Sequence, residues 1–260
     1  MAALEVEQRG AAAWFWLNRP EVRNALNSEI QELLELNLEK AEKHAEVRAI
    51  VIAGRGQAFS AGGDLSRMEK AARMTKARNR KEAGRFASLL YRVHNYPKPV
   101  VARVHGAAFA GGMGLVAACD LVVAAEQAEF CLPEVRIGLV PAMISPYIAR
   151  ALGAPQTRRY MLTGERLPAP EAKRLGFVHE CVPGAELDAT VDKLVGALAK
   201  AGPQALARSK KLLARIAAVP LGPKLAAETA ALLAEVRAGP EAREGIRAFL
   251  EKRKPGWARS

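Results

Sequence analysis

The chain has 260 residues, enough for one large domain or for a domain with an appendage. Half of the residues are hydrophobic, which excludes a disordered chain, and only three are cysteines, which excludes a disulfide framework. The formal net charge of +12 favours an anionic partner.

Strands and helices alternate over the first part of the chain. Four apolar runs are predicted to be buried strands: 11–17, 47–53, 100–104 and 121–125. Helices are predicted between them at 27–43, 65–95 and 106–119. The alternation predicts an α/β core, which we assign to residues 1–200.

The pattern changes after residue 200. Three helices without any strand signal are predicted at 204–216, 225–237 and 241–253, separated by Gly/Pro breaks. We expect residues 201–260 to form a helical oligomerisation region that packs on the core or on a sister subunit.

No membrane or secretory segment is expected. The apolar run 106–125 contains several glycines and Asp120, which fit a buried helix leading into a strand better than a membrane span. The first ten residues include acids and lack a long apolar run, so we expect a cytoplasmic protein.

Basic residues gather in two places, between Asp64 and Phe86 and near the C-terminus. Most charge runs are solvated faces, but both groups could also contact phosphates. Nucleic acid is one such partner, although the aromatic content of 5% supplies few stacking platforms. A phosphorylated small molecule fits equally well on charge alone.

Residues 105–147 are the most informative stretch. The cluster Gly111-Gly112-Met113-Gly114 begins an apolar helix, where bare backbone N–H groups can stabilise a developing negative charge. Glu134 follows in a loop between two prolines, and a carboxylate in apolar company is suited to carry a proton. The structural alternatives are glycines that serve helix packing and a Glu134 paired with Arg136.

Two competing motifs are weaker. Gly54–Phe59 approaches a dinucleotide-binding fingerprint but lacks its third glycine. Ala58–Gly62 approaches a nucleophile elbow, and Asp120 and His179 follow in hydrolase order, but one glycine is missing. The four histidines lack metal-ligand spacing, so no metal is expected.

Several motifs occur together in one order along the chain. They are Arg19–Leu26 (RPEVRNAL), Ala58–Leu65 (AFSAGGDL), Lys98–Val100, residues 106–120 and Leu162–Glu165. Over nearly the whole chain they resemble the crotonase superfamily of enoyl-CoA hydratases and isomerases. The resemblance implies an α/β spiral of ββα repeats with a helical C-terminal trimerisation region. It also implies a homotrimer or dimer of trimers, an acyl-CoA substrate and no cofactor beyond coenzyme A itself.

The resemblance implies roles for individual residues. The N–H groups of Gly63 and Gly111 would form an oxyanion hole for the thioester oxygen, and Glu134 would be the acid/base. The expected coenzyme A contacts are Val22, Ala25, Leu26, Ala61, Gly63, Asp64 and Leu65, with Lys252 or Lys254 reaching a phosphate from a neighbouring subunit. No DNA or membrane partner is expected, and RNA binding by the basic surface is a distant alternative.

Gly114 departs from the family pattern, because typical enoyl-CoA hydratases carry a first glutamate there and a second at the position of Glu134. Residues 114–120 and 130–147 look like the bacterial branch of 3-methylglutaconyl-CoA and isohexenylglutaconyl-CoA hydratases, which shows the same glycine. The resemblance implies a hydratase acting on a 2-enoyl-CoA, as in leucine degradation. The alternative is a Δ3,Δ2-enoyl-CoA isomerase with a single glutamate.

Overall fold

A computed structural model of the protein describes residues 2–64 and 73–258. Leu65 and the beginning of the helix predicted at 65–95 lie outside the described residues.

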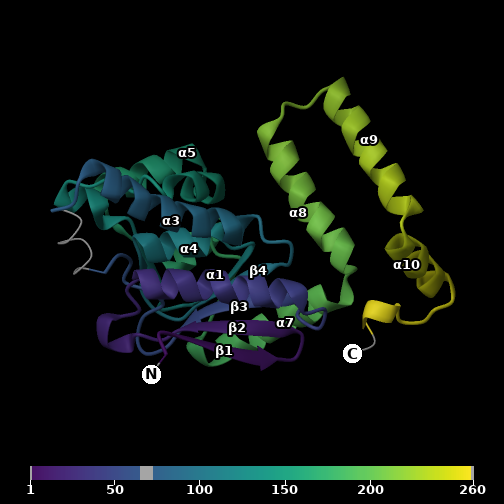
Figure 1. Cartoon of the computed structure of the whole chain (residues 1–260), viewed down its shortest axis with the longest axis horizontal. Coiled ribbons are helices and arrows are strands. Elements are labelled where there is room, and N and C mark those ends of the chain that lie inside the picture. Colours follow the sequence, from purple (N-terminus) through teal and green to yellow (C-terminus); the bar gives the residue numbers. More distant parts are fainter. Residues whose placement is uncertain (1, 65–72, 259–260) are drawn as a thin grey trace.

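A six-stranded sheet forms the base of the molecule (Figure 1). Its strands, in spatial order, are β1 (Leu4–Arg9), β2 (Ala12–Leu17), β3 (Ala49–Gly54), β4 (Val100–Val104), β6 (Leu121–Ala125) and β9 (Glu180–Val182). β1 runs antiparallel to β2, and the other neighbours are parallel. The four predicted strands are confirmed. β1 was not predicted, because its sequence LEVEQR contains only two apolar residues and lies at a sheet edge.

The parallel strands bury both faces of the sheet, as their continuous apolar sequences require. Phe15 and Ile52 point into the larger core cluster, beneath the helices on one face. Trp14 and Val51, their neighbours in sequence, point to the opposite face and pack against Val191 of α7 (Leu187–Lys200). Side chains therefore alternate between two cores along each strand.

Among the described residues, five helices cover or flank the sheet in addition to α7. They are α1 (Ser28–Lys43), α3 (Lys76–His94), α4 (Gly111–Ala118), α5 (Ser145–Thr163) and α6 (Ala169–Arg174). Asn27 caps α1 by accepting a hydrogen bond from the Ile30 N–H at 2.9 Å. α5 is interrupted by non-helical backbone at Gly153, just before Pro155.

A second, small sheet lies beside the N-terminus of α4. It has the order β5 (Ala108–Phe109), β7 (Glu129–Cys131) and β8 (Arg166–Pro168). Strands of two or three residues leave no periodic signal in a sequence, so none of them was predicted. Three of the four 3₁₀ turns, η1 (Pro20–Val22), η2 (Pro133–Ile137) and η3 (Gly184–Glu186), connect the larger elements.

The C-terminal helices form an arm that stands away from the sheet (Figure 1). The arm consists of α8 (Pro203–Ala218), α9 (Pro223–Ala238) and α10 (Pro240–Leu250), followed by η4 (Gly256–Ala258). These helices confirm the three predicted from the sequence. Lys210 of α8 holds the arm to the core by donating a hydrogen bond to Asp120 at 2.6 Å.

Within the described ranges, no helix combines the length and the apolar composition needed to cross a bilayer.

Candidate active site

Parallel pairing brings three chain segments side by side. Ser60 pairs with Ala108 through an isolated parallel bridge, and Ala108 of β5 pairs with Phe130 of β7. The predicted oxyanion residues follow a few positions later on the first two segments, at Gly63 and Gly111. The third segment continues into η2, which carries Glu134. Because the segments run in the same direction, their ends meet on one side of the small sheet.

Both predicted oxyanion N–H groups are available. Within the described part of the chain, neither the Gly63 N–H nor the Gly111 N–H donates a hydrogen bond to a protein acceptor. Gly111 is the first residue of α4, where the helix dipole favours negative charge. Ala110, just before it, has φ 47°, a left-handed value that costs an alanine about 1 kcal/mol or more. This strained backbone fixes the direction in which the Gly111 N–H points.

The segment that leads to Gly63 and the segment that leads to Gly111 touch at Gly62. A Cβ built on this residue would lie 2.7 Å from the Phe109 carbonyl oxygen and 2.8 Å from the Ala110 Cβ. Its φ of +93° is also a value that other residues rarely adopt. Only glycine therefore allows the loop before Gly63 to pack against the backbone that leads into Gly111.

Two buried polar side chains hold the segment that leads to Gly63 against the segment that contains Asn24. Asn24 is fully buried and donates hydrogen bonds from Nδ2 to the carbonyl oxygens of Arg55 and Ala58, both at 2.8 Å. Ser60 donates from Oγ to the Asn24 carbonyl oxygen at 2.9 Å and accepts a bond from the Gly62 N–H at 3.2 Å. Both residues lie in motifs quoted from the sequence, but their structural roles were missed, because an Asn or a Ser carries no signal of which backbone groups it will meet.

Glu134 is partly buried, and one oxygen of its carboxylate has no compensating partner. Its Oε2 atom is inaccessible to solvent and has no hydrogen-bond partner among the described residues. Burial in apolar surroundings raises the pKa of its carboxyl group, against which only its own backbone N–H acts. Glu134 lies in the 3₁₀ turn η2, not in an irregular loop as predicted, because Pro133 starts a turn that the αL residue Gly138 ends. The structural alternative of a Glu134–Arg136 ion pair is wrong. A carboxyl group with a raised pKa is suited to accept and return a proton.

The position of Gly114 is closed by a neighbour. It lies on α4, and a Cβ built there would collide with the side chain of Ile144, 2.6 Å from its Cβ. Ile144 is the residue before α5 and is 2% exposed. The apolar side chain of Ile144 therefore fills the space beside Gly114, the position at which two-glutamate hydratases carry their first glutamate.

Two of the other residues predicted to contact coenzyme A are almost fully buried, and two lie in or near the segment that leads to Gly63. Leu26, which pairs with Gly63, lies close to Gly111 and is almost fully buried, as is Ala25. Ala61 lies next to Gly62 in the same oxyanion segment, and Val22 is 40% exposed at its edge.

Asp64 is almost fully buried and forms an ion pair with Arg19. It accepts a hydrogen bond from Arg19 Nη1 at 2.9 Å, and the same nitrogen donates to the Ala25 carbonyl oxygen. Lys252 and Lys254 follow α10 at the end of the arm, apart from α4 within a single chain (Figure 1).

The hydrolase alternative finds no support. Ser60 Oγ is buried and bonded to backbone, and Asp120 is bonded to Lys210 and to the Val100 N–H. His179 uses Nδ1 to accept a hydrogen bond from the Val122 N–H. These side chains serve three separate structural contacts. Among the described residues, no group of three His, Cys, Asp or Glu is placed to hold a metal ion.

Comparison with known proteins agrees with the fold and the arrangement of these segments. Residues 7–260 match the family model described as enoyl-CoA hydratase/isomerase. A Thermus thermophilus protein, provisionally named an enoyl-CoA hydratase, is 40% identical over 95% of this chain and 98% of its own. The 2,3-dehydroadipyl-CoA hydratase of Escherichia coli is 34% identical over 98% of both chains. The crystal structure of an enoyl-CoA hydratase from Shewanella pealeana superposes with a TM-score of 0.95 at 36% identity, over 98% of this chain and 96% of that one.

The fold is therefore the α/β crotonase fold, with a mixed sheet and a helical C-terminal region. The chain belongs to the enoyl-CoA hydratase/isomerase family and is an enzyme.

Proposed function

We propose that the protein is an enoyl-CoA hydratase that adds water to a branched 2-enoyl-CoA of the 3-methylglutaconyl kind, with Glu134 as its one acid/base. The observation that carries the proposal is the unpartnered carboxylate oxygen of Glu134. A buried group left unpaired costs free energy, about 1–3 kcal/mol, and such a cost at the end of three converging segments is typical of a functional site.

The residues supply a balanced reaction. Water adds to C3 of the 2-enoyl thioester while Glu134 accepts its proton, and the electron pair of the C2–C3 double bond moves onto the thioester oxygen. The Gly63 and Gly111 N–H groups stabilise the resulting enolate oxygen. Glu134 then returns the proton to C2 as the enolate collapses, which regenerates the carboxylate. Coenzyme A arrives as part of the substrate, and no further cofactor takes part.

A substrate with a distal carboxylate is supported by the surroundings of Gly111. A Cβ on Gly111 would lie 3.3 Å from Phe86, so helix α3 borders the site. This helix carries a cationic series: Lys76, Arg78, Arg80, Lys81 and Arg85. One relative is named for 2,3-dehydroadipyl-CoA, a thioester of a dicarboxylic acid. A cation from α3 would favour such a substrate over an uncharged one of equal length.

A panel of acyl-CoA thioesters tests the proposal. The purified protein is given crotonyl-CoA, 3-methylcrotonyl-CoA and 3-methylglutaconyl-CoA, and the loss of enoyl absorbance is followed with products identified by mass. We expect products heavier by one water, with the highest kcat/KM for 3-methylglutaconyl-CoA. Equal kcat/KM for 3-methylcrotonyl-CoA and 3-methylglutaconyl-CoA would exclude recognition of the distal carboxylate. Absence of any hydrated product would exclude the hydratase.

The second candidate is a Δ3,Δ2-enoyl-CoA isomerase. It is favoured by Gly114, because removing a proton from one carbon and returning it to another needs a single carboxylate. An isomerase converts a 3-enoyl-CoA into its 2-enoyl isomer without a change of mass. Presenting 3-hexenoyl-CoA to the protein and finding an unchanged mass with new enoyl absorbance would favour this candidate.

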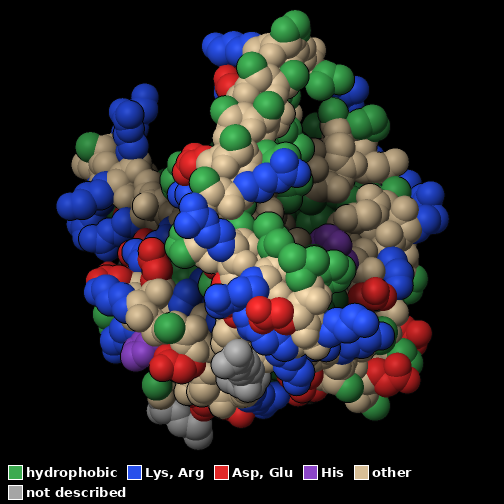
Figure 2. Space-filling model, turned by 90° about the vertical axis from the view of Figure 1, so that its right-hand side faces the viewer, with side chains coloured by type: hydrophobic (Ala, Val, Ile, Leu, Met, Phe, Trp, Pro, Cys, Tyr) green, Lys and Arg blue, Asp and Glu red, His purple; other side chains and the backbone are tan. Residues whose placement is uncertain are grey.

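We also propose that the arm assembles the protein into a homotrimer or a dimer of trimers. Its helices and the α8–α9 connection expose large apolar side chains: Leu213, Ile216, Leu221, Leu233, Ile246, Phe249 and Leu250. Figure 2, which faces this side, shows hydrophobic groups among the Lys and Arg of the arm. Exposed apolar surface of this extent is typical of an interface between chains.

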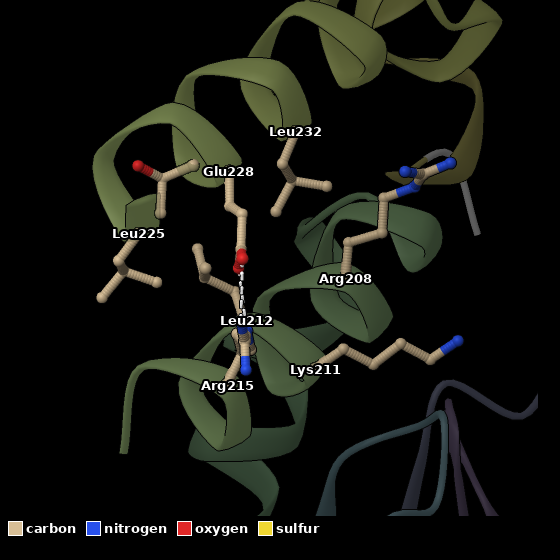
Figure 3. A pocket seen from close by; sticks show the side chains of 8 residues that line it. Arg208, Lys211, Leu212, Arg215, Leu225, Glu228 and Leu232 are labelled. Atoms are coloured by element: carbon tan, nitrogen blue, oxygen red, sulfur yellow. Dashed lines mark hydrogen bonds and ion pairs between the residues drawn. The ribbon is translucent and has the colours of Figure 1, made fainter. Parts of the chain in front are cut away.

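A pocket of about 420 Å³ lies between α8 and α9 and is open to solvent (Figure 3). Leu212, Leu225 and Leu232 lie along it, and the Arg215–Glu228 ion pair at 2.8 Å spans the two helices.

Assembly and coenzyme A binding are tested separately. Light scattering during size exclusion should give three or six times the chain mass of 28.0 kDa, and a monomer would refute the assembly. Lys252→Ala and Lys254→Ala should raise KM for acyl-CoA if the C-terminus reaches a phosphate of a neighbouring subunit's ligand. A KM unchanged in both variants would refute that contact.

A further inference from the structure

Gly114 and Ile144 form a small–large pair between α4 and the start of α5. A Cβ on Gly114 would lie 2.6 Å from Ile144 Cβ and still closer to its Cγ2 methyl, and 3.6 Å from Ile144 Cα. These atoms belong to the base of a β-branched side chain, whose χ1 is restricted and whose Cβ is fixed by the backbone. Ile144 therefore cannot swing aside to admit a side chain at position 114.

The contact differs from those at the other glycines of the cluster. A Cβ on Gly111 would meet the ring edge of Phe86 and the Leu26 Cδ1 methyl, at 3.3–3.5 Å, which are mobile ends of side chains. A Cβ on Gly112 would meet the backbone carbonyl oxygen of Ser60 at 2.7 Å. Only at Gly114 is the obstacle a single exchangeable side chain.

This pair bears on the chemistry because Gly114 stands where two-glutamate hydratases carry their first carboxylate. The space beside Gly114 is not left empty for a water molecule or a larger acyl group, because Ile144 is buried and fills it. An aliphatic side chain offers neither a proton acceptor nor a hydrogen bond to water. The point at which Gly114 of α4 faces the start of α5 is therefore apolar.

We propose that Ile144 is a specificity-determining residue: it occupies the space of a second acid/base and thereby leaves proton transfer to Glu134 alone. The inference rests on the proposed function for its chemical meaning. It predicts that a glutamate at position 114 is excluded while Ile144 is present and is admitted when Ile144 is reduced to glycine.

A double-mutant cycle of melting temperatures tests the packing between Gly114 and Ile144. Gly114→Ala should lower the melting temperature by roughly 5–10 °C, since overpacking a well-filled core is destabilising. The same substitution in an Ile144→Gly background should cost less than about 2 °C, because the obstructing side chain is gone. Gly112→Ala is the matched control, and its cost should be the same in both backgrounds. Equal costs of Gly114→Ala in the two backgrounds would refute the inference.

An activity cycle tests the chemical role. In the parent protein, Glu134→Gln should reduce hydration about 10²–10⁴-fold. In the Gly114→Glu/Ile144→Gly protein, the same substitution should cost at least tenfold less, because a second carboxylate shares the proton transfer. A loss of the same size in both proteins would show that Ile144 does not control how many acid/base groups act.

The two proposals fail in different ways. A parent protein that hydrates no enoyl-CoA refutes the proposed function and, with it, the chemical role of Ile144. Additive melting shifts refute the Gly114–Ile144 pair whatever the activity of the parent.

Discussion

Asn24→Ala tests whether a single buried amide anchors the segment that leads to Gly63. The Asn24 side chain is fully buried and makes three hydrogen bonds at 2.8 Å: two donated to carbonyl oxygens and one accepted from the Arg19 N–H. Alanine leaves all three backbone partners unpaired, at about 1 kcal/mol each. The residue also has φ 55°, which asparagine tolerates better than alanine by about 1 kcal/mol.

The sum is about 4 kcal/mol, a large part of the stability of a typical domain. Urea denaturation, followed at constant m-value, measures the loss. Asn27→Ala is the matched control, because that side chain makes one N-cap bond and should cost about 1 kcal/mol. If Asn24→Ala lowers the free energy of unfolding no more than Asn27→Ala, the proposed role of Asn24 in anchoring the segment that leads to Gly63 is wrong.

The remaining predictions concern the amides, the arm and pH. Gly63→Pro removes one oxyanion donor and should lower kcat about 10²–10³-fold with little change in melting temperature; a change below threefold would exclude Gly63 as a donor. Lys210→Met leaves the Asp120 carboxylate without its cation and should cost about 3 kcal/mol in denaturant, whereas adding Asp120→Asn should recover part of that loss. Because burial raises the pKa of Glu134, kcat/KM should fall on the acid side at a higher pH than for an exposed glutamate, as a pH profile would show. The same shift means that the Glu134 contribution to stability is full below its unfolded pKa and is lost as pH rises through the folded one. Glu134→Gln should therefore stabilise the protein more at pH 8 than near pH 5, and a gain that is constant with pH would contradict the raised pKa of the carboxyl group.

Much of the fold follows from local sequence patterns. Strands β2, β3, β4 and β6 are apolar runs between polar loops, and the arm helices are separated by Gly/Pro breaks. Elements whose stability depends on partners were missed. The polar edge strand β1 and the short strand β5 have no periodic signal of their own.

The residues of the site also divide into those with a local sequence signal and those whose role depends on a partner elsewhere in the chain. Glu134, Gly63 and Gly111 could be proposed from motifs, because the proposed reaction needs a carboxylate and two bare backbone N–H groups. Ile144 could not be selected, because an isoleucine before a helix is typical of any core and its meaning depends on Gly114 across the gap. The hydrogen bonds of Asn24 are also contacts between segments, and a single sequence does not say which segments will meet.

The central claim is that Glu134 alone moves the proton between water and C2. Its most direct test is hydration of an enoyl-CoA in D₂O by the parent protein and by Glu134→Gln, with deuterium at C2 of the product measured by mass spectrometry. Glu129→Gln serves as the control, because that carboxylate forms an exposed ion pair with Arg166. We expect one deuteron at C2 from the parent and the control, and a rate about 10²–10⁴-fold lower for Glu134→Gln. A Glu134→Gln protein that deuterates C2 within tenfold of the parent rate would contradict the account.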